Sequence, residues 1–143
     1  MVDQALLKEL QGKLDAGPED IKAEDTLRVF EFFKQIAAEN EEMQEELEDL
    51  DLVIQIEITD LKTFFWLTVK DGKIDYGKGD IENPTFLFST SMEIALGMIF
   101  GKTDATSEYM AGNVAIEGSL PDAMSFQGII ELAMELFEEL TEE

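Results

Sequence analysis

The chain has 143 residues and contains neither cysteine nor histidine. Without cysteine it can form no disulfide, no thiolate nucleophile and no cysteine-bound zinc site. Without histidine it lacks the usual general base and the commonest metal ligand. Residues 71–75 also lack the ligand spacing of a calcium loop. We therefore expect no catalytic residues, no metal and no cofactor.

Basic residues are scarce, with ten Lys and Arg against 33 Asp and Glu, for a formal charge of −23. Nucleic-acid binding requires cations that displace counterions from phosphates, so we expect no nucleic-acid partner. The acids gather at 39–51 and 131–143, whereas 62–78 is near neutral. Most acids are interpreted as solvated helix faces. Alternatively, the near-neutral segment approaches an anionic surface. Transient membrane contact is compatible with the sequence but is disfavoured by the net negative charge.

Long apolar runs are also missing, since none approaches the roughly 20 residues that cross a bilayer. The N-terminus has no basic segment before its first leucines, unlike a secretory signal. We expect a soluble, cytoplasmic protein. With 45% hydrophobic residues and no composition break, the chain is predicted to form one domain over 1–143, with N-terminal helices at 1–49, a sheet region at 50–118 and a C-terminal helix at 119–140.

The N-terminal part shows helical periodicity. Leucines at 6, 7, 10 and 14 predict a first helix that Gly17-Pro18 ends. A second, longer helix is predicted from Asp25 or Thr26 to about Asp49, with an apolar stripe and a cluster of three phenylalanines at 30, 32 and 33.

The middle of the chain alternates as strands do. The alternation over residues 50–58 predicts a strand with one buried and one solvent-exposed face. The pattern from Phe64 to Val69 predicts a strand that is apolar on both faces. Such a strand either has both of its faces covered by other parts of a protein or exposes an aromatic patch. Asp71-Gly72 is a hairpin signal before a returning strand at 74–77.

Shorter elements follow. A strand is predicted at 85–89, then a helix capped by the Thr90 hydroxyl with Glu93 three residues on, which Gly101 ends. Asp104 can cap a further turn, and a strand at 113–117 ends at Gly118.

The last predicted helix, from about Pro121 to Leu140, is apolar over most of its circumference. A helix of this kind is buried on most sides, forms an oligomer interface, or lines an apolar cavity. Five methionines in this half of the chain favour a cavity because thioethers adapt to variable apolar ligands, although ordinary core packing also explains them.

An ordered set of motifs resembles the sterol carrier protein 2 family over roughly Leu50 to Leu136. These motifs are Trp66-Leu67-Thr68-Val69, Asp71-Gly72, Pro84-Thr85-Phe86-Leu87-Phe88-Ser89, Ser91-Met92-Glu93, Phe100-Gly101-Lys102-Thr103-Asp104, Met110-Ala111-Gly112-Asn113-Val114-Ala115-Ile116-Glu117-Gly118 and Asp122-Ala123-Met124. The resemblance implies an α+β fold, a five-stranded, largely antiparallel mixed sheet covered on one face by helices, with an additional N-terminal helix. It also implies an apolar tunnel.

The resemblance further implies non-enzymatic binding and intracellular transfer of fatty acyl chains, acyl-CoA or sterol-like molecules. Few lysines are available near such a tunnel, so we expect no tight phosphate site. The candidate ligand-contacting residues are Phe33, Phe65, Trp66, Phe86, Phe88, Met92, Met98, Ile99, Met110, Phe126, Ile130, Met134 and Phe137.

Two alternatives remain open at this point. The apolar C-terminal helix could instead dimerise or dock on a partner without a lipid cargo, so both a monomer and a homodimer are compatible with the sequence. An acid–base enzyme built on Asp71 and Asp75 is disfavoured, because solvent at a hairpin tip does not tune carboxylates for catalysis.

Overall fold

Five strands and six helices follow one another in a computed structural model that describes residues 2–16, 22, 24–99 and 103–141. The predicted helix stops at Gly17-Pro18 and Gly101 lie outside the described residues. The elements, in chain order, are α1 (Gln4–Ala16), α2 (Asp25–Glu39), α3 (Glu41–Leu47), β1 (Leu52–Ile58), β2 (Thr63–Lys70), β3 (Lys73–Lys78), β4 (Phe86–Thr90), α4 (Met92–Ile99), α5 (Ala105–Met110), β5 (Ala115–Gly118) and α6 (Leu120–Thr141).

The strands form one sheet in the order β3-β2-β1-β4-β5. The central pair β1 and β4 is parallel, and the other three pairs are antiparallel. At the β2–β3 turn, Asp71 and Gly72 have φ values of 53° and 74°, as a two-residue hairpin turn with the twist of the flanking strands requires. The mixed five-stranded α+β fold with an additional N-terminal helix is thus confirmed.

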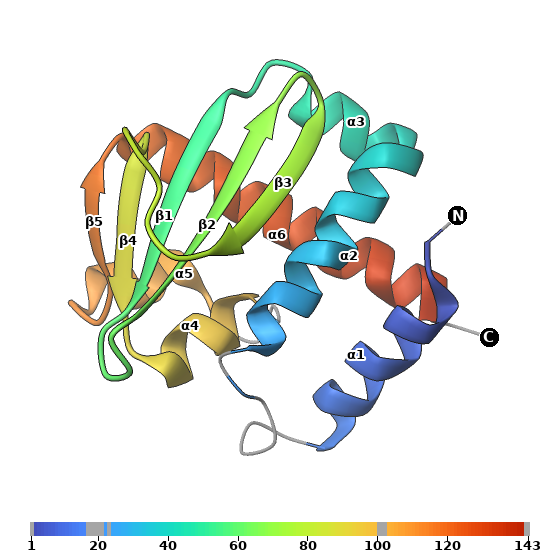
Figure 1. Cartoon of the computed structure of the whole chain (residues 1–143), viewed down its shortest axis with the longest axis horizontal. Coiled ribbons are helices and arrows are strands. Elements are labelled where there is room, and N and C mark those ends of the chain that lie inside the picture. The colour runs from blue at the N-terminus through green and yellow to red at the C-terminus, as the bar shows by residue number, and fades with distance from the viewer. Residues whose placement is uncertain (1, 17–21, 23, 100–102, 142–143) are drawn as a thin grey trace.

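The helices cover one face of this sheet (Figure 1). Alternate residues of β1, β2 and β4 point towards them and are buried, including Ile54, Leu67 and Phe86 at exposures of 1% or less. Helix α2 packs along β3, and α6 runs behind the sheet from β5 towards α1 (Figure 1). The hydrophobic core lies between this sheet face and these two helices.

The other sheet face carries the second apolar set of β2. Phe64 and Trp66 are half-buried there, and Trp66 lies over Gly77, where an added Cβ would come within 2.6 Å of the indole ring. The connection from β3 to β4 crosses this face (Figure 1). Gln55 holds it, donating from Nε2 to the Gly79 carbonyl at 3.0 Å and accepting at Oε1 from the Ile81 amide at 2.7 Å.

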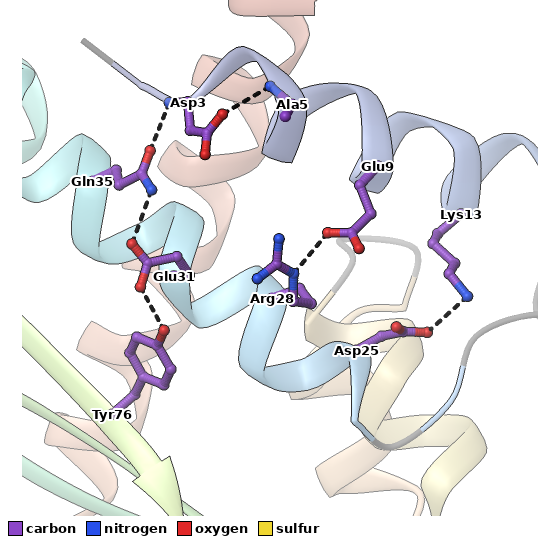
Figure 2. Close-up of polar contacts among 9 residues, drawn as sticks. All are labelled: Asp3, Ala5, Glu9, Lys13, Asp25, Arg28, Glu31, Gln35 and Tyr76. Atoms are coloured by element: carbon purple, nitrogen blue, oxygen red, sulfur yellow. Dashed lines mark hydrogen bonds and ion pairs between the residues drawn. The ribbon is translucent and has the colours of Figure 1, made fainter.

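Helix α1 is attached to α2 by a chain of polar contacts above the core (Figure 2). The Asp3 amide donates to Gln35 Oε1 at 2.7 Å, Gln35 Nε2 donates to Glu31 at 2.9 Å, and the Tyr76 hydroxyl of β3 donates to the same carboxylate. Arg28 pairs with Glu9 at 2.7 Å. These contacts, together with buried leucines of α1, join the N-terminal helix to the rest of the fold.

The predicted long helix over 25–49 was wrong in one respect, because it breaks at Asn40. That residue is extended (φ −101°, ψ 122°), and its side-chain oxygen accepts a hydrogen bond from the Met43 amide at 2.9 Å. An Asn that caps the second segment replaces the continuous backbone ladder, so α2 and α3 change direction at this point.

Three other boundaries differ from the sequence prediction. The Thr90 hydroxyl does not cap α4; it donates to the Asn113 carbonyl at 2.7 Å, while Asp60 accepts the Met92 amide at 3.0 Å. Strand β1 begins at Leu52, two residues later than expected, and β5 is shifted to Ala115–Gly118. Asp104 caps α5 as predicted, accepting from the Thr106 amide at 3.1 Å.

Candidate ligand cavity

An apolar cavity of about 240 Å³ lies at the β4–β5 end of the sheet, beneath α5 and the first half of α6. Its deep wall is formed by buried side chains of β4 and α6, and its rim by exposed ones. The lining residues are Phe86, Phe88, Thr106, Tyr109, Met110, Ile116, Leu120, Ala123, Met124, Phe126, Gln127 and Ile130.

The register of β4 and β5 determines which side chains border this space. Phe88 pairs with Ile116 across β4 and β5, whereas Phe86 pairs with Gly118, which has no side chain to place beside it. Gly118 is required here, because its φ is 114° and an added Cβ would come within 2.5 Å of the Thr85 carbonyl oxygen. On α6, the small side chain of Ala123 faces the same space.

The rim of the cavity is apolar and open to solvent. Met110 is 81% exposed and Met124 is 62% exposed, with Tyr109 and Leu120 beside them at 39% and 41%. Large apolar side chains that gather at the mouth of an apolar cavity are typical of binding surfaces.

Two polar side chains also line the cavity, Thr106 of α5 and Gln127 of α6. The Thr106 hydroxyl donates to Gln127 Oε1 at 2.8 Å, and Gln127 Nε2 donates to Asp104 at 3.1 Å and to Glu131 at 3.3 Å. This pair joins α5 to α6. The hydrogen bond from the Ser107 hydroxyl, with those from the Thr106 amide and Gln127, holds the pKa of Asp104 below its usual value, so this carboxyl is ionised at neutral pH.

Five of the thirteen candidate ligand residues from the sequence line this cavity, namely Phe86, Phe88, Met110, Phe126 and Ile130. Phe33, Phe65, Met98 and Phe137 are buried in the core elsewhere, Met92 and Met134 are partly buried against it, and Trp66 lies on the opposite face of the sheet. The side chain of Ile99 lies outside the described residues.

Sequence reasoning did not select the other seven lining residues. Ile116, Ala123 and Met124 belong to motifs that carried the family resemblance, and Met124 is also one of the five methionines that favoured a cavity. Thr106 and Gln127 offered none, because neither stands in an apolar pattern and their contact joins positions 21 residues apart.

A second, wider depression lies between α2, α3 and the β2–β3 turn, and most of its lining side chains are charged. An alkyl chain would gain little there. Groups of three or more metal-ligating side chains do not occur among the described residues. Over the same part of the chain, every helix is too short or too polar to span a bilayer.

The sheet and its helical cover define an α+β domain with an apolar cavity that is open to solvent at its rim. The model of the SCP-2 sterol transfer family matches residues 33–131, well over half of the chain, and the chain therefore belongs to this family. Among curated proteins, none matches it.

Solved structures share the fold at low identity. The UbiJ-SCP2 ubiquinone synthesis protein has a TM-score of 0.63 at 13% identity, with 79% of this chain and 93% of that chain covered. Palmitated SCP2L2 from Aedes aegypti has a TM-score of 0.55 at 15% identity, with 74% of this chain and 92% of that chain covered. The stereoselective inverting sec-alkylsulfatase Pisa1 from Pseudomonas sp. has a TM-score of 0.55 at 17% identity, covering 60% of this chain and only 14% of the sulfatase.

Proposed function

We propose that this protein is a non-enzymatic lipid carrier that holds the apolar part of its cargo in the cavity between β4, β5, α5 and α6. The observation that carries the proposal is an apolar space with an apolar, exposed rim in a member of a sterol transfer family. Fatty acyl chains and sterol-like molecules are the cargo classes that fit such walls, and one structural relative is described as palmitated.

The size of the cavity suits part of a lipid. At about 240 Å³ it exceeds the roughly 150 Å³ cavity that binds benzene and falls below the roughly 300–1,000 Å³ of pockets for drug-sized ligands. Each buried methylene contributes about 0.8 kcal/mol, so ten would contribute about 8 kcal/mol before ordering costs are subtracted. The rest of a longer ligand would lie along Met110, Leu120 and Met124.

The groups beside the cavity support carriage without catalysis. Thr106 and Gln127 are hydrogen-bonded to each other, and neither is a general base that could activate a nucleophile. Of the thirteen candidate residues, we propose that the five lining the cavity contact the ligand. The other eight remain predictions.

Native mass spectrometry of the freshly purified protein, followed by solvent extraction, tests this function. We expect a mass excess that extracts as a lipid. Met124→Asp places a charge on the rim and should lower the occupancy, whereas Leu140→Asp, on the same helix but outside the cavity lining, should leave it unchanged. A protein without bound mass after incubation with acyl chains and sterols would contradict the proposal.

The exposed rim also favours a second candidate function, docking of α6 onto a partner or a second copy. In that case Met124→Asp would change the oligomeric state or partner binding while the mass spectrum showed no lipid in either variant. The same pair of variants therefore separates the two functions.

A further inference from the structure

The two polar side chains of the cavity wall are fixed in one hydrogen-bonding arrangement. Gln127 Nε2 lies 3.1 Å from Asp104 Oδ1 and 3.3 Å from Glu131 Oε1. Ionised carboxylates only accept hydrogen bonds, so the amide must present its NH₂ group to them. Turning the amide round would place its oxygen against two anions.

This orientation determines the role of Thr106. Because Gln127 Oε1 faces the threonine hydroxyl at 2.8 Å, and an amide oxygen can only accept, that hydroxyl must donate its single proton to Gln127. Both N–H groups of Gln127 and the proton of Thr106 are therefore committed. The free lone pairs on Thr106 Oγ1 and Gln127 Oε1 can only accept.

We propose that the polar end of the ligand is a neutral or cationic hydrogen-bond donor, such as a hydroxyl or an amine, which Thr106 and Gln127 accept, and that carboxylate and phosphate ends are disfavoured. This inference rests on the proposed function and names the head-group class of the same site. An anionic end offers acceptors alone and meets acceptors, so it gains no hydrogen bond from this pair.

The charge around the cavity also disfavours an anionic ligand end. Among the described residues, the lining contains no Lys or Arg, while the carboxylates of Asp104 and Glu131 are hydrogen-bonded to Gln127. The formal charge of −23 extends the same sign over the whole chain. Tyr109 also lines the cavity, but a phenol both donates and accepts, so it does not discriminate between the head groups.

Four probes, each with a chain of ten carbons, test the proposal at neutral pH: decan-1-ol, decylammonium, methyl decanoate and decanoate. The methyl ester is neutral and accepts only, so it separates the donor effect from the charge effect. Binding is followed through the ¹³C-labelled ε-methyl groups of methionine, because Met110 and Met124 line the cavity. Met43, fully buried in α3 outside the cavity, reports on the integrity of the fold.

We expect decan-1-ol to shift the Met110 and Met124 signals with a dissociation constant about two- to tenfold below that of methyl decanoate, the range that one neutral hydrogen bond supports. Decylammonium donates charge-assisted hydrogen bonds and should bind at least as tightly as decan-1-ol. Decanoate should bind more weakly than the ester. Thr106→Val removes one of the two accepting groups and should reduce the advantage of decan-1-ol over the ester, with ester binding unchanged. Tyr109→Phe should leave the order of affinities as it is.

The double variant Asp104→Asn/Glu131→Gln keeps a capping side chain on α5 and frees the Gln127 amide to turn. The double variant should then bind decanoate at least about three times more tightly than the parent protein does. Equal affinities for all four probes in the parent protein would overturn the head-group proposal and leave the carrier function standing. If no probe moved Met110 or Met124 while Met43 stayed native, both the carrier function and the head-group proposal would fail.

Discussion

The two ends of the helix-covered sheet face are both apolar, yet one is filled and the other is hollow. Under α2, Phe30 and Phe33 lie 5.9 Å apart between ring centroids, and Phe32 meets Phe137 of α6 edge to face at 5.5 Å. At the β4–β5 end, Phe86 and Phe126 are 6.3 Å apart and border a cavity of about 240 Å³. Side-chain volume and strand register, rather than polarity, separate a core from a binding site.

Polar contacts differ between the two ends as well. At the filled end, the Tyr76 hydroxyl donates to Glu31 and connects the sheet directly to α2 (Figure 2). At the hollow end, Thr106 and Gln127 connect α5 to α6, so the two helices are tied to each other. We therefore expect α5 and α6 to move away from the sheet more readily than α2, as entry of a ligand would require.

The largest expected change in the free energy of unfolding comes from removing a buried phenylalanine at the filled end. Phe33 is fully buried, and Phe33→Ala should lower the free energy of unfolding by about 3–5 kcal/mol, since the surrounding rings cannot collapse into the space. Met124→Ala, at the exposed rim, should change it by less than about 0.5 kcal/mol. Urea unfolding of the two variants measures the difference, and a similar loss for both would mean that the two ends are packed alike.

A matched pair on α6 sharpens the comparison. Ala133 is fully buried in the core, and Ala133→Leu should cost about 1–3 kcal/mol of stability through overpacking. Ala123 faces the cavity, so Ala123→Leu should leave the free energy of unfolding unchanged or raise it. The same variant should weaken decan-1-ol binding about tenfold, because the added carbons replace roughly two methylenes of ligand contact.

Urea unfolding and methionine NMR check this pair, with decan-1-ol as the probe. Ala133→Leu serves as the control for binding, because its added carbons lie outside the cavity lining. If Ala123→Leu destabilised the protein as much as Ala133→Leu, the space beneath α5 would already be occupied by the protein's own side chains.

Local signals in the sequence were sufficient for most elements of the fold. Asp71-Gly72 predicted the hairpin turn, and both residues have the positive φ that this turn needs. The predicted final helix differs from α6 by one residue at each end. The break at Asn40 also had a signal that the prediction passed over, namely an Asn followed by two acids at the start of a second helical segment.

The position of the cavity depends on contacts that no local pattern contains. The phenylalanine cluster at 30–33 and the aromatic residues of β4 are equally apolar in sequence, but only the latter line a cavity. At the cavity, Phe86 pairs with Gly118 across β4 and β5, and α5 contacts α6 through the hydrogen bond of Thr106 with Gln127. Both contacts join residues more than 20 positions apart, beyond the reach of periodicity arguments.

The contact between Tyr76 and Glu31 yields the smallest predicted effect and a distinct dependence on pH. Desolvation, the hydrogen bond to Glu31 and the nearby charge of that carboxylate raise the pKa of Tyr76 to about 12. Partial burial alone would raise the pKa of Glu31, but the hydrogen bonds from Tyr76 and Gln35, with Lys34 and Arg28 nearby, bring it below its usual value.

The signs of the two shifts define where the contact stabilises the fold. The raised pKa of Tyr76 contributes stability that is complete below the unfolded value of about 10 and is lost as the pH rises through about 12. The depressed pKa of Glu31 contributes stability that is present above the ordinary carboxyl value and is lost as the pH falls through the folded value.

Tyr76→Phe should cost about 1 kcal/mol at neutral pH. Urea unfolding at pH 8 and pH 11 should show a smaller stability gap between parent and variant at pH 11. With a folded pKa of about 12, unfolding of the parent releases the Tyr76 proton at this pH and lowers the parent's stability, whereas the phenylalanine variant has no such proton. Other groups that titrate at alkaline pH are the same in both proteins and cancel in the comparison, so a gap that stays constant or widens at pH 11 would contradict the raised pKa and the contact between β3 and α2.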